Sequence, residues 1–508
     1  ETYGVPPASG GGYGVQGRVG LNRSFLVNTY YPLYSNFFSQ LGFETVLPDL
    51  PTQEGIDQRG AAFCYPVELA HGFFDTLLKS EPPLDYIFLP HFKAVPNLKD
   101  ESSAQSQVCP LVQGETYYLQ TSFRPAIERL RQRGTRLLAP LIDLSQGVRS
   151  AEAPLLEAAE QMGVSRKAAR EAFAFARQRQ LDCFAAMKAA GRQALAELEA
   201  HPEKFGVVLF ARPYNGFAEE AHMGIPHKFA SRGITVIPLD FLDLEQERSK
   251  RHMYWGMGKL LMKAARRVEK HPQLFGTYIT NFSCGPDSFV ISYFRDIMGR
   301  KPSLTLELDS HTADAGLETR VEAFLDIVNA YRQLLARRLI APRRSAFTPA
   351  RTLFDDGRPR VVTSSGEALP MPDPRVTVLI PSMGRLATEA GAAILKGYGL
   401  HARAGRENDE AILKLGRAST SCKECLPLIL TTGTLLSYIQ NGKRADEVVV
   451  YFMPTGSGPC RFGQYYIFME DLVRRLEIPN VALLALSSDN SYVGMDKNFE
   501  RHAWWAVV

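Results

Sequence analysis

Six cysteines lie in loops bounded by glycine or proline, and this shared setting limits what the chain can fold into. Two of the loops follow strand-like runs directly: residues 275–282 precede Cys284, and residues 447–453 precede Cys460. Each of these two loops then leads into a helix-like run. Open α/β sheets bind ligands at the carboxyl ends of their strands, where such loops lie. The pattern therefore predicts two cofactor-holding units in one chain. The six cysteines are Cys64, Cys109, Cys284, Cys422, Cys425 and Cys460.

Alternating strand-like and helix-like runs predict an α/β protein with several Rossmann-like parallel-sheet units and a helical-hairpin insertion. Residues 30–41 carry apolar side chains at helical spacing, Gly42 ends the run, and residues 44–47 form the next strand-like run. The expected divisions are an extended glycine-rich arm at 1–20, a Rossmann-like domain at 21–150 with Cys64 and Cys109, a helical hairpin at 151–204, a Rossmann-like domain at 205–336 with Cys284, a linker at 337–374, and a Rossmann-like domain at 375–508 with Cys422, Cys425 and Cys460.

Composition defines the hairpin and the linker. Residues 155–200 contain no proline and are rich in Ala, Glu, Gln, Arg and Leu, and Ser165 is placed to cap the second helix. Cys183 falls inside that helix, where a small apolar residue usually serves packing. Residues 337–374 are rich in Arg and Pro and show no periodicity, which is typical of a linker.

The charge and the cysteine count exclude several classes of protein. The net charge of +4 over 508 residues implies no large field for nucleic acid or a membrane surface. The sequence contains no run of eighteen apolar residues, which argues against a membrane span. Seven cysteines, an odd number, do not form a disulfide framework in a chain of this length. We therefore expect a cytoplasmic protein without nucleic-acid or membrane partners. The chain starts at Glu1, so we also expect it to be part of a longer polypeptide.

The cysteines admit three chemical interpretations. Soft thiolates bind iron–sulfur clusters, and backbone N–H groups at a helix start would offset the charge of the bound sulfides. The pair Cys422 and Cys425 also fits zinc or a redox dithiol. A zinc site usually brings a second close pair of cysteines, which this sequence lacks. Buried structural thiols are the third interpretation.

Several segments together resemble the 2-hydroxyacyl-CoA dehydratase and benzoyl-CoA reductase superfamily. The likeness is greater to its large activase-like proteins and to the double-cubane cluster proteins, and it extends from about Arg18 to Tyr492. The segments that carry it are Phe63-Cys64-Tyr65-Pro66-Val67-Glu68-Leu69-Ala70-His71-Gly72, Cys109-Pro110-Leu111-Val112-Gln113, Cys284-Gly285-Pro286-Asp287-Ser288-Phe289, His311-Thr312-Ala313-Asp314-Ala315-Gly316, residues 422–427 and residues 458–465.

The resemblance implies a cofactor and a partner. Family members hold a 4Fe-4S cluster on three cysteines, a layout that Cys64, Cys109 and Cys284 fit. With Cys422, Cys425 and Cys460 added, the chain looks like the branch that holds a double-cubane 8Fe-9S cluster, or else two 4Fe-4S clusters. The implied function is reduction of a small or CoA-linked substrate with low-potential electrons from an ATP-hydrolysing activator. No phosphate-binding Walker motif occurs, so ATP is expected on a separate or fused ATPase. A homodimer is a further candidate for the assembly of the chain.

Three further residues are candidates for catalysis beside such a cluster. Glu68 and His71 lie one helical turn apart after Cys64, so either is placed to donate a proton to a substrate. Arg461 beside Cys460 is placed to bond a cluster sulfide or an anionic substrate. An ordinary polar helix face and a surface arginine are the alternatives. Arg212, Tyr214 and Asn215, at a strand exit, are further pocket candidates.

Two other functions compete with the reductase. One is a 2-hydroxyacyl-CoA dehydratase-like enzyme with one 4Fe-4S cluster and an acyl-CoA tunnel. The other is a non-catalytic subunit that relays electrons or docks an ATPase.

Overall fold

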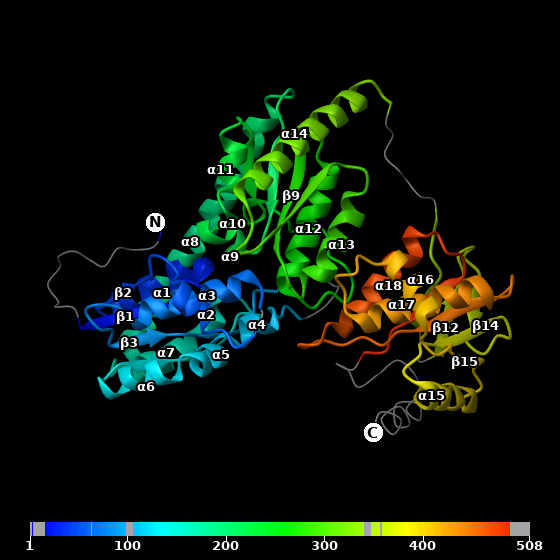
Figure 1. Ribbon diagram of the computed structural model, residues 1–508, viewed down its shortest axis with the longest axis horizontal. Helices are drawn as coiled ribbons and strands as arrows, with labels where there is room; N and C mark the ends of the chain where they lie inside the picture. The colour runs from blue at the N-terminus through cyan, green and yellow to red at the C-terminus, as the bar shows by residue number, and fades with distance from the viewer. Residues whose placement is uncertain are drawn as a thin grey trace. The chain divides into compact units, whose positions relative to one another are not determined.

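The computed structural model describes Tyr3 and residues 16–61, 63–97, 105–339, 347–355 and 358–487. The chain divides into two compact units (Figure 1). The bounds of unit 1 are Glu1–Ser249, Tyr254–Cys284 and Ile297–Ala341, and those of unit 2 are Lys250–Met253, Gly285–Asp296 and Pro342–Val508. The fold is mixed α/β with three four-stranded parallel sheets in the described residues, so the predicted fold class is confirmed.

The first sheet of unit 1 has the strand order β2-β1-β3-β5, and all its pairs are parallel. Helix α1 covers it because Tyr34, Phe37 and Phe38 repeat at helical spacing and are fully buried. The prediction of an extended arm over 1–20 is wrong at its end, because residues 17–20 form most of β1. Residues 1, 2 and 4–15 of the predicted arm lie outside the described residues. The elements are β1 (Gly17–Leu21), α1 (Val27–Gln40), β2 (Phe43–Val46), β3 (Tyr86–Phe88) and β5 (Arg136–Leu138).

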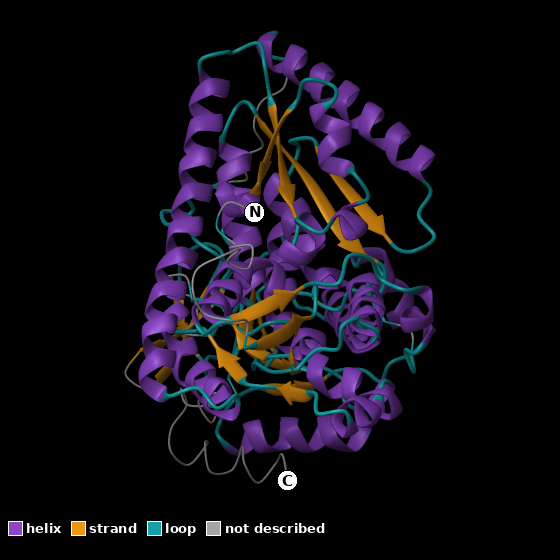
Figure 2. Cartoon of the chain, turned by 90° about the vertical axis from the view of Figure 1, so that its left-hand side faces the viewer, coloured by secondary structure: helices purple, strands orange, loops and turns teal. Residues whose placement is uncertain are grey.

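The second sheet of unit 1 has the order β10-β9-β7-β8 and is also fully parallel. Every residue of its two central strands is buried, as expected for strands covered on both faces. Helices lie on both sides of this sheet in Figure 2. The strands are β7 (Gly206–Phe210), β8 (Thr235–Pro238), β9 (Leu274–Asn281) and β10 (Ser303–Leu308), and the covering helices include α11 (Ile225–Ala230), α12 (Gly256–Lys270) and α14 (Asp314–Ala336).

Two helices occupy the segment for which the sequence predicts a hairpin: α7 (Glu152–Gln161) and the long α8 (Arg166–Glu199). The expected cap is confirmed, because the Ser165 hydroxyl accepts a hydrogen bond from the Ala168 N–H at 3.3 Å. Helix α8 packs on α1 and also on the 3-10 turn η2 (Leu239–Phe241) and β8. It therefore joins the two sheets of unit 1.

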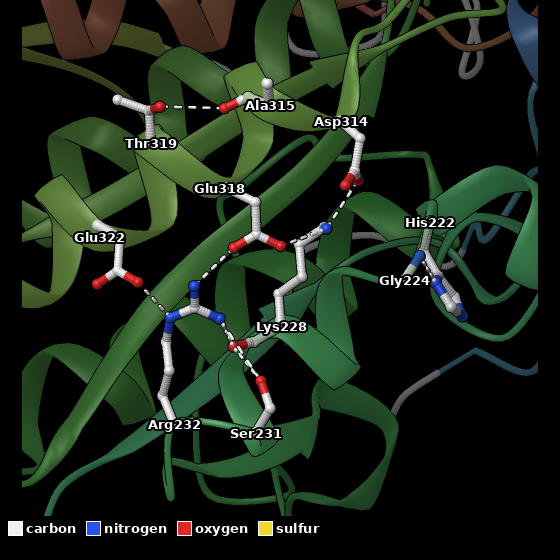
Figure 3. Close-up of polar contacts among 10 residues, drawn as sticks. All are labelled: His222, Gly224, Lys228, Ser231, Arg232, Asp314, Ala315, Glu318, Thr319 and Glu322. Carbon is white, nitrogen blue, oxygen red and sulfur yellow. Dashed lines mark hydrogen bonds and ion pairs between the residues drawn. The ribbon is translucent and has the colours of Figure 1, made fainter.

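Ion pairs fasten two helices on one face of the second sheet (Figure 3). Lys228 of α11 lies 2.7 Å from Asp314 and 2.6 Å from Glu318 of α14. Arg232 also contacts Glu318 at 2.6 Å and Glu322 at 2.6 Å. These charges lie around the apolar contact between Phe229 and the side chains of α14. They therefore fix how α11 and α14 align along each other.

Unit 2 contains the third parallel sheet, with the order β15-β14-β16-β17. Helix α13 (Asp287–Met298) is shared between the units, and its first ten residues belong to unit 2. There the Tyr293 hydroxyl donates a hydrogen bond to the Gln464 carbonyl at 3.1 Å. The other elements are β14 (Val376–Ile380), α15 (Arg385–Gly397), β15 (Ala402–Ala404), α16 (Glu410–Ser419), α17 (Leu426–Asn441), β16 (Val448–Phe452), α18 (Tyr465–Arg475) and β17 (Val481–Leu484).

Part of the predicted linker at 337–374 is instead a small antiparallel sheet. Its strands are β11 (Arg351–Asp355), β12 (Arg358–Val362) and β13 (Ala368–Pro370). Val361 and Leu369 are buried in the core of unit 2, whereas the arginines and prolines between them obscure the period-two pattern in the sequence. Within the described residues, no helix is both long and apolar enough to cross a bilayer.

Helices α16 and α17 pack so closely that two glycines are required. A Cβ at Gly433 would lie 2.0 Å from the Ile412 carbonyl oxygen, and one at Gly416 would lie 1.9 Å from the Ile429 oxygen. We expect Gly433→Ala to destabilise unit 2 by about 2–4 kcal/mol, because backbone must move to make room. Unfolding followed by hydrogen exchange in α16 and α17 measures this. Gly397→Ala is the control, since no atom lies within 4 Å of its Cβ position. Equal stability of the two variants would contradict the close packing.

Candidate functional site

Four of the six cysteines occupy the residue directly before a helix. Cys64 precedes α3 (Tyr65–Leu78), Cys109 precedes α4 (Pro110–Gln113), Cys425 precedes α17 and Cys460 precedes the 3-10 turn η3 (Arg461–Gln464). Their backbone is extended, and the first three helices carry a proline in their first two positions. Cys284 lies two residues further from its helix, in the turn between β9 and α13. The amino ends of helices present unpaired N–H groups and a positive dipole, which favour a thiolate.

Cys64 shows how burial opposes this effect. Burial raises the pKa of the Cys64 thiol to about 12, and the nearby Cys109 raises it further. A hydrogen bond from the Val67 N–H and the charge of Arg212 act in the opposite direction. Cys64 therefore carries a proton at neutral pH, and binding a metal would release that proton.

Three cysteines of unit 1 converge on two residues that follow β7. Arg212 donates a hydrogen bond to the Cys284 sulfur at 3.5 Å. Tyr214 is buried and has a raised pKa, chiefly through burial, and the thiols of Cys109, Cys284 and Cys64 raise it further. Arg212 and Cys284 follow the adjacent strands β7 and β9, where the chain order of the sheet reverses. This is the position at which open α/β sheets bind ligands.

Buried polar atoms near these thiols have no hydrogen-bond partner among the described residues. The Tyr118 hydroxyl is one of them, and both amide atoms of Asn215, next to Tyr214, are others. The pKa of Tyr118 is raised by burial first, and then by the charges of Glu115, Cys64 and Cys109. Buried polar groups are normally paired, so these atoms are placed to bond a ligand. The thiols, the cation and the unpaired donors fit a sulfur-bridged metal cluster.

The donor set does not fit a single ion equally well. Within the described ranges, no three His, Cys, Asp or Glu side chains come close enough together to bind one metal ion. A zinc site would need all its ligands on one atom. Thiolates of an iron–sulfur cluster bind different irons, so they are spread around the cluster.

A buried carboxyl group lies next to Tyr118. Glu115 accepts hydrogen bonds from the Asn22 amide at 3.0 Å and from the Ser24 hydroxyl. Burial raises the pKa of Glu115 to about 7, although both hydrogen bonds oppose the rise. The group therefore changes protonation near neutral pH.

The thiols of unit 2 are arranged differently. The sulfur of Cys425 lies 2.8 Å from the Tyr465 hydroxyl. The pKa of Tyr465 is raised by burial, by this hydrogen bond, and by the charges of Cys425 and Cys460. Cys422 is exposed, has a left-handed φ of 60° and lies 3.9 Å from the Arg417 carbonyl. Cys425 and Cys460 thus share Tyr465 as a neighbour, and Cys460 is exposed like Cys422.

Arg461 and Gln464 flank this second group. Arg461 donates a hydrogen bond to the Ser288 hydroxyl at 2.9 Å, which ties it to the start of α13. The Gln464 side chain is fully buried, yet neither of its amide atoms has a partner among the described residues. The prediction that Arg461 meets a sulfide or a substrate stays a prediction.

His71 and Glu68 both lie on α3, but their surroundings differ. His71 is fully buried, its Nδ1 lies 2.8 Å from the Val67 carbonyl oxygen, and its ring stacks on Tyr118 at 5.3 Å. Burial lowers the pKa of His71, so the ring is neutral at pH 7. Glu68 lies 3.3 Å from Arg59. Their proposed role as proton donors is untested.

Three residues near the thiols did not stand out in the sequence: Tyr118, Glu115 and Tyr465. Each lies on a helix that follows a cysteine, six to nine residues after Cys109 or five residues after Cys460. Polar residues on the buried face of such a helix were the available signal. The aromatic run around Tyr465 was instead expected to serve core packing alone.

The raised pKa of Glu115 predicts a pH dependence of stability. Because the folded state holds the proton more tightly than the unfolded chain, stability rises as the pH falls from about 7 towards 4.5. The shift corresponds to roughly 3 kcal/mol. Chemical unfolding at pH 5 and pH 8 should show this difference in the wild type and a much smaller one in Glu115→Gln. The exposed Glu128→Gln is the control, and an unchanged pH slope in Glu115→Gln would contradict the assignment.

Removal of the Arg212 charge should slow the reaction of the neighbouring thiols. In the reduced, metal-free protein at pH 8, we expect Arg212→Met to lower the alkylation rates of Cys64 and Cys284 by roughly three- to tenfold, because the thiolate loses its cation. Peptide-resolved mass spectrometry measures both rates. Arg320→Met, whose native guanidinium bonds the Thr305 carbonyl, is the control. Equal rates in both variants would exclude a role for Arg212.

Residues 18–242 match the family model described as CoA enzyme activase uncharacterised domain (DUF2229). The match includes nearly all of the first sheet, helices α7 and α8, and β7. It therefore includes Cys64, Cys109 and Arg212. No curated protein matches the chain. This first part of the chain is thus similar to a domain of CoA enzyme activases, which supports a relationship to the CoA-linked dehydratase and activase superfamily.

Proposed function

We propose that the chain is an iron–sulfur reductase that receives low-potential electrons from an ATP-hydrolysing activator. Cys64, Cys109 and Cys284 would hold a cubane cluster in unit 1, and Cys422, Cys425 and Cys460 would supply the thiolates of unit 2. The substrate would be a small or CoA-linked molecule, in keeping with the activase-like match of residues 18–242. The observation that carries the proposal is the convergence of three thiols on Arg212 and Tyr214.

A bound cluster would supply single electrons at low potential and, with three protein thiolates, one iron open to a further ligand. The chain's own residues provide the surroundings. Arg212 and the amino ends of α3 and α4 offset negative charge at the thiols. The Tyr118 hydroxyl is a buried donor without a protein partner among the described residues. Glu115, which titrates near pH 7, is suited to hold a proton beside it.

A dehydratase-like enzyme with one 4Fe-4S cluster is the second candidate. It is favoured by the exposure of two of the three thiols of unit 2, Cys422 and Cys460, whereas Cys64 is buried in unit 1. In this alternative only the three thiols of unit 1 bind the cluster. The third candidate, a non-catalytic subunit that relays electrons, differs from both enzymes because no substrate would bind at the open iron.

Iron and acid-labile sulfide in anaerobically produced protein test the proposal. We expect about eight irons per chain if both thiol groups are loaded, and about four if only unit 1 is. The triple variant Cys64→Ser, Cys109→Ser, Cys284→Ser should lose at least half of the iron and the matching visible absorption. Cys183→Ser is the matched control and should retain all of it.

The reverse triple variant separates the two candidates. Loss of half the iron in Cys422→Ser, Cys425→Ser, Cys460→Ser supports two loaded groups, whereas full retention supports the single-cluster dehydratase. Colourless protein that contains stoichiometric zinc and no sulfide would contradict both.

A further inference from the structure

Unit 1 contains a cavity of about 470 Å³ that none of the six loop cysteines lines, as far as the described residues show. Its walls come from α1, α8, the 3-10 turn η2 and the start of α12. These elements belong to both sheet regions of unit 1, so the cavity lies where α8 joins them. The proposed cluster function does not depend on this site.

Most of the wall is aromatic or aliphatic. Tyr30 packs edge-on against Phe184 with ring centroids 6.2 Å apart, and Phe217 lies 6.5 Å from Phe241. Phe217 is 40% exposed, although it is a large apolar residue, which places it at the rim. Met187, Met257 and Leu260 also belong to the apolar lining. A cavity of this size and polarity is typical of small-molecule sites.

Two charged side chains face this apolar space without pairing directly. Lys188 donates a hydrogen bond to the Leu242 carbonyl at 2.6 Å. The Asp240 carboxylate accepts a hydrogen bond from its own backbone N–H, and no ion pair within 4 Å involves it among the described residues. Burial raises the pKa of Asp240 to about 6, and Lys188 opposes the rise. At pH 7 the cavity therefore contains a desolvated carboxylate that lacks a close cation.

Of the two charged residues that line the cavity, Lys188 already bonds the Leu242 carbonyl, whereas Asp240 has no cation within ion-pair distance among the described residues. Lys188 is surrounded by Asp240, Asp243 and Glu245, with Arg192 as the further cation. Asp243 and Arg192 pair with each other at 3.3 Å and, like Glu245, do not line the cavity, so the carboxylate that faces the ligand space is Asp240. Aromatic faces also attract cations. The Thr29 hydroxyl lines the cavity and has no hydrogen-bond partner in the described part of the chain, so it is available to a polar ligand group.

We propose that this cavity binds an organic amine, with its protonated nitrogen at Asp240 and its apolar body against the rings of Tyr30, Phe184 and Phe241. The carboxylate selects the charge and the cavity walls select an aromatic or aliphatic body. An anionic molecule of the same shape would meet Asp240 and bind less well.

Calorimetric titration of the full chain with three indoles of similar size tests the proposal. Tryptamine carries the cation, 3-methylindole is neutral and indole-3-acetate is anionic. We expect tryptamine to bind at one site, and each of the other two to bind at least about tenfold more weakly. Asp240→Asn should weaken tryptamine binding about tenfold or more, because it removes the charge and keeps the shape.

Asp243→Asn is the matched control, since Asp243 lies 3.3 Å from Arg192 and does not line the cavity. It should change tryptamine affinity by less than about twofold. Met187→Trp fills the cavity and should abolish binding, which locates the site. Melting temperatures report whether each variant folds. Equal affinity of Asp240→Asn and wild type, tighter binding of indole-3-acetate, or no binding of tryptamine at millimolar concentration would overturn the proposal.

Discussion

The candidate site depends on one structural constraint. The carboxyl ends of parallel strands and the amino ends of the helices that follow them meet at a common edge of the sheet. Cys64 and Cys109 are the residues directly before α3 and α4, and Cys284 follows β9. In the first turn of these helices the Val67 and Val112 N–H groups donate to the carbonyls of Cys64 and Cys109, and any N–H group left without a helical partner favours a negative sulfur. Burial acts against this preference, and Cys64 shows that burial dominates in the metal-free protein.

The residues around the unit 1 thiols form a polar interior that is incomplete by itself. Tyr118 and Asn215 contribute buried polar atoms that lack partners within the described chain. Glu115 is nearby and is held by Asn22 and Ser24. Such groups normally destabilise a fold unless a ligand pairs with them. The arrangement suits a site whose occupant completes its hydrogen bonds.

The sequence predicted the sheets well because apolar runs such as those of β7 and β9 are long and continuous. It also predicted the cap at Ser165, since capping is a local property. It was wrong about part of the linker, where Arg and Pro between Val361 and Leu369 conceal a small sheet. The assignment of the first ten residues of α13 to unit 2 depends on tertiary contacts such as the one between Tyr293 and Gln464, which no local pattern reveals.

The loops of the candidate site were visible in the sequence, but their neighbours were less so. Glycine and proline mark where the cysteines lie, whereas the hydroxyl of Tyr118 and the carboxyl of Glu115 become informative only when their burial is known. The cavity at Asp240 is assembled from α1, α8, η2 and α12, which are far apart in the chain. A site assembled from such distant segments leaves no continuous motif in the sequence.

The central claim is that thiols from separate loops hold iron together. Anomalous diffraction from anaerobic crystals, recorded on both sides of the iron absorption edge, tests it most directly. The account predicts a cluster of iron peaks bonded to the sulfurs of Cys64, Cys109 and Cys284, beside Arg212 and Tyr214. No iron signal at these sulfurs in crystals of protein that retains its iron and sulfide would contradict it.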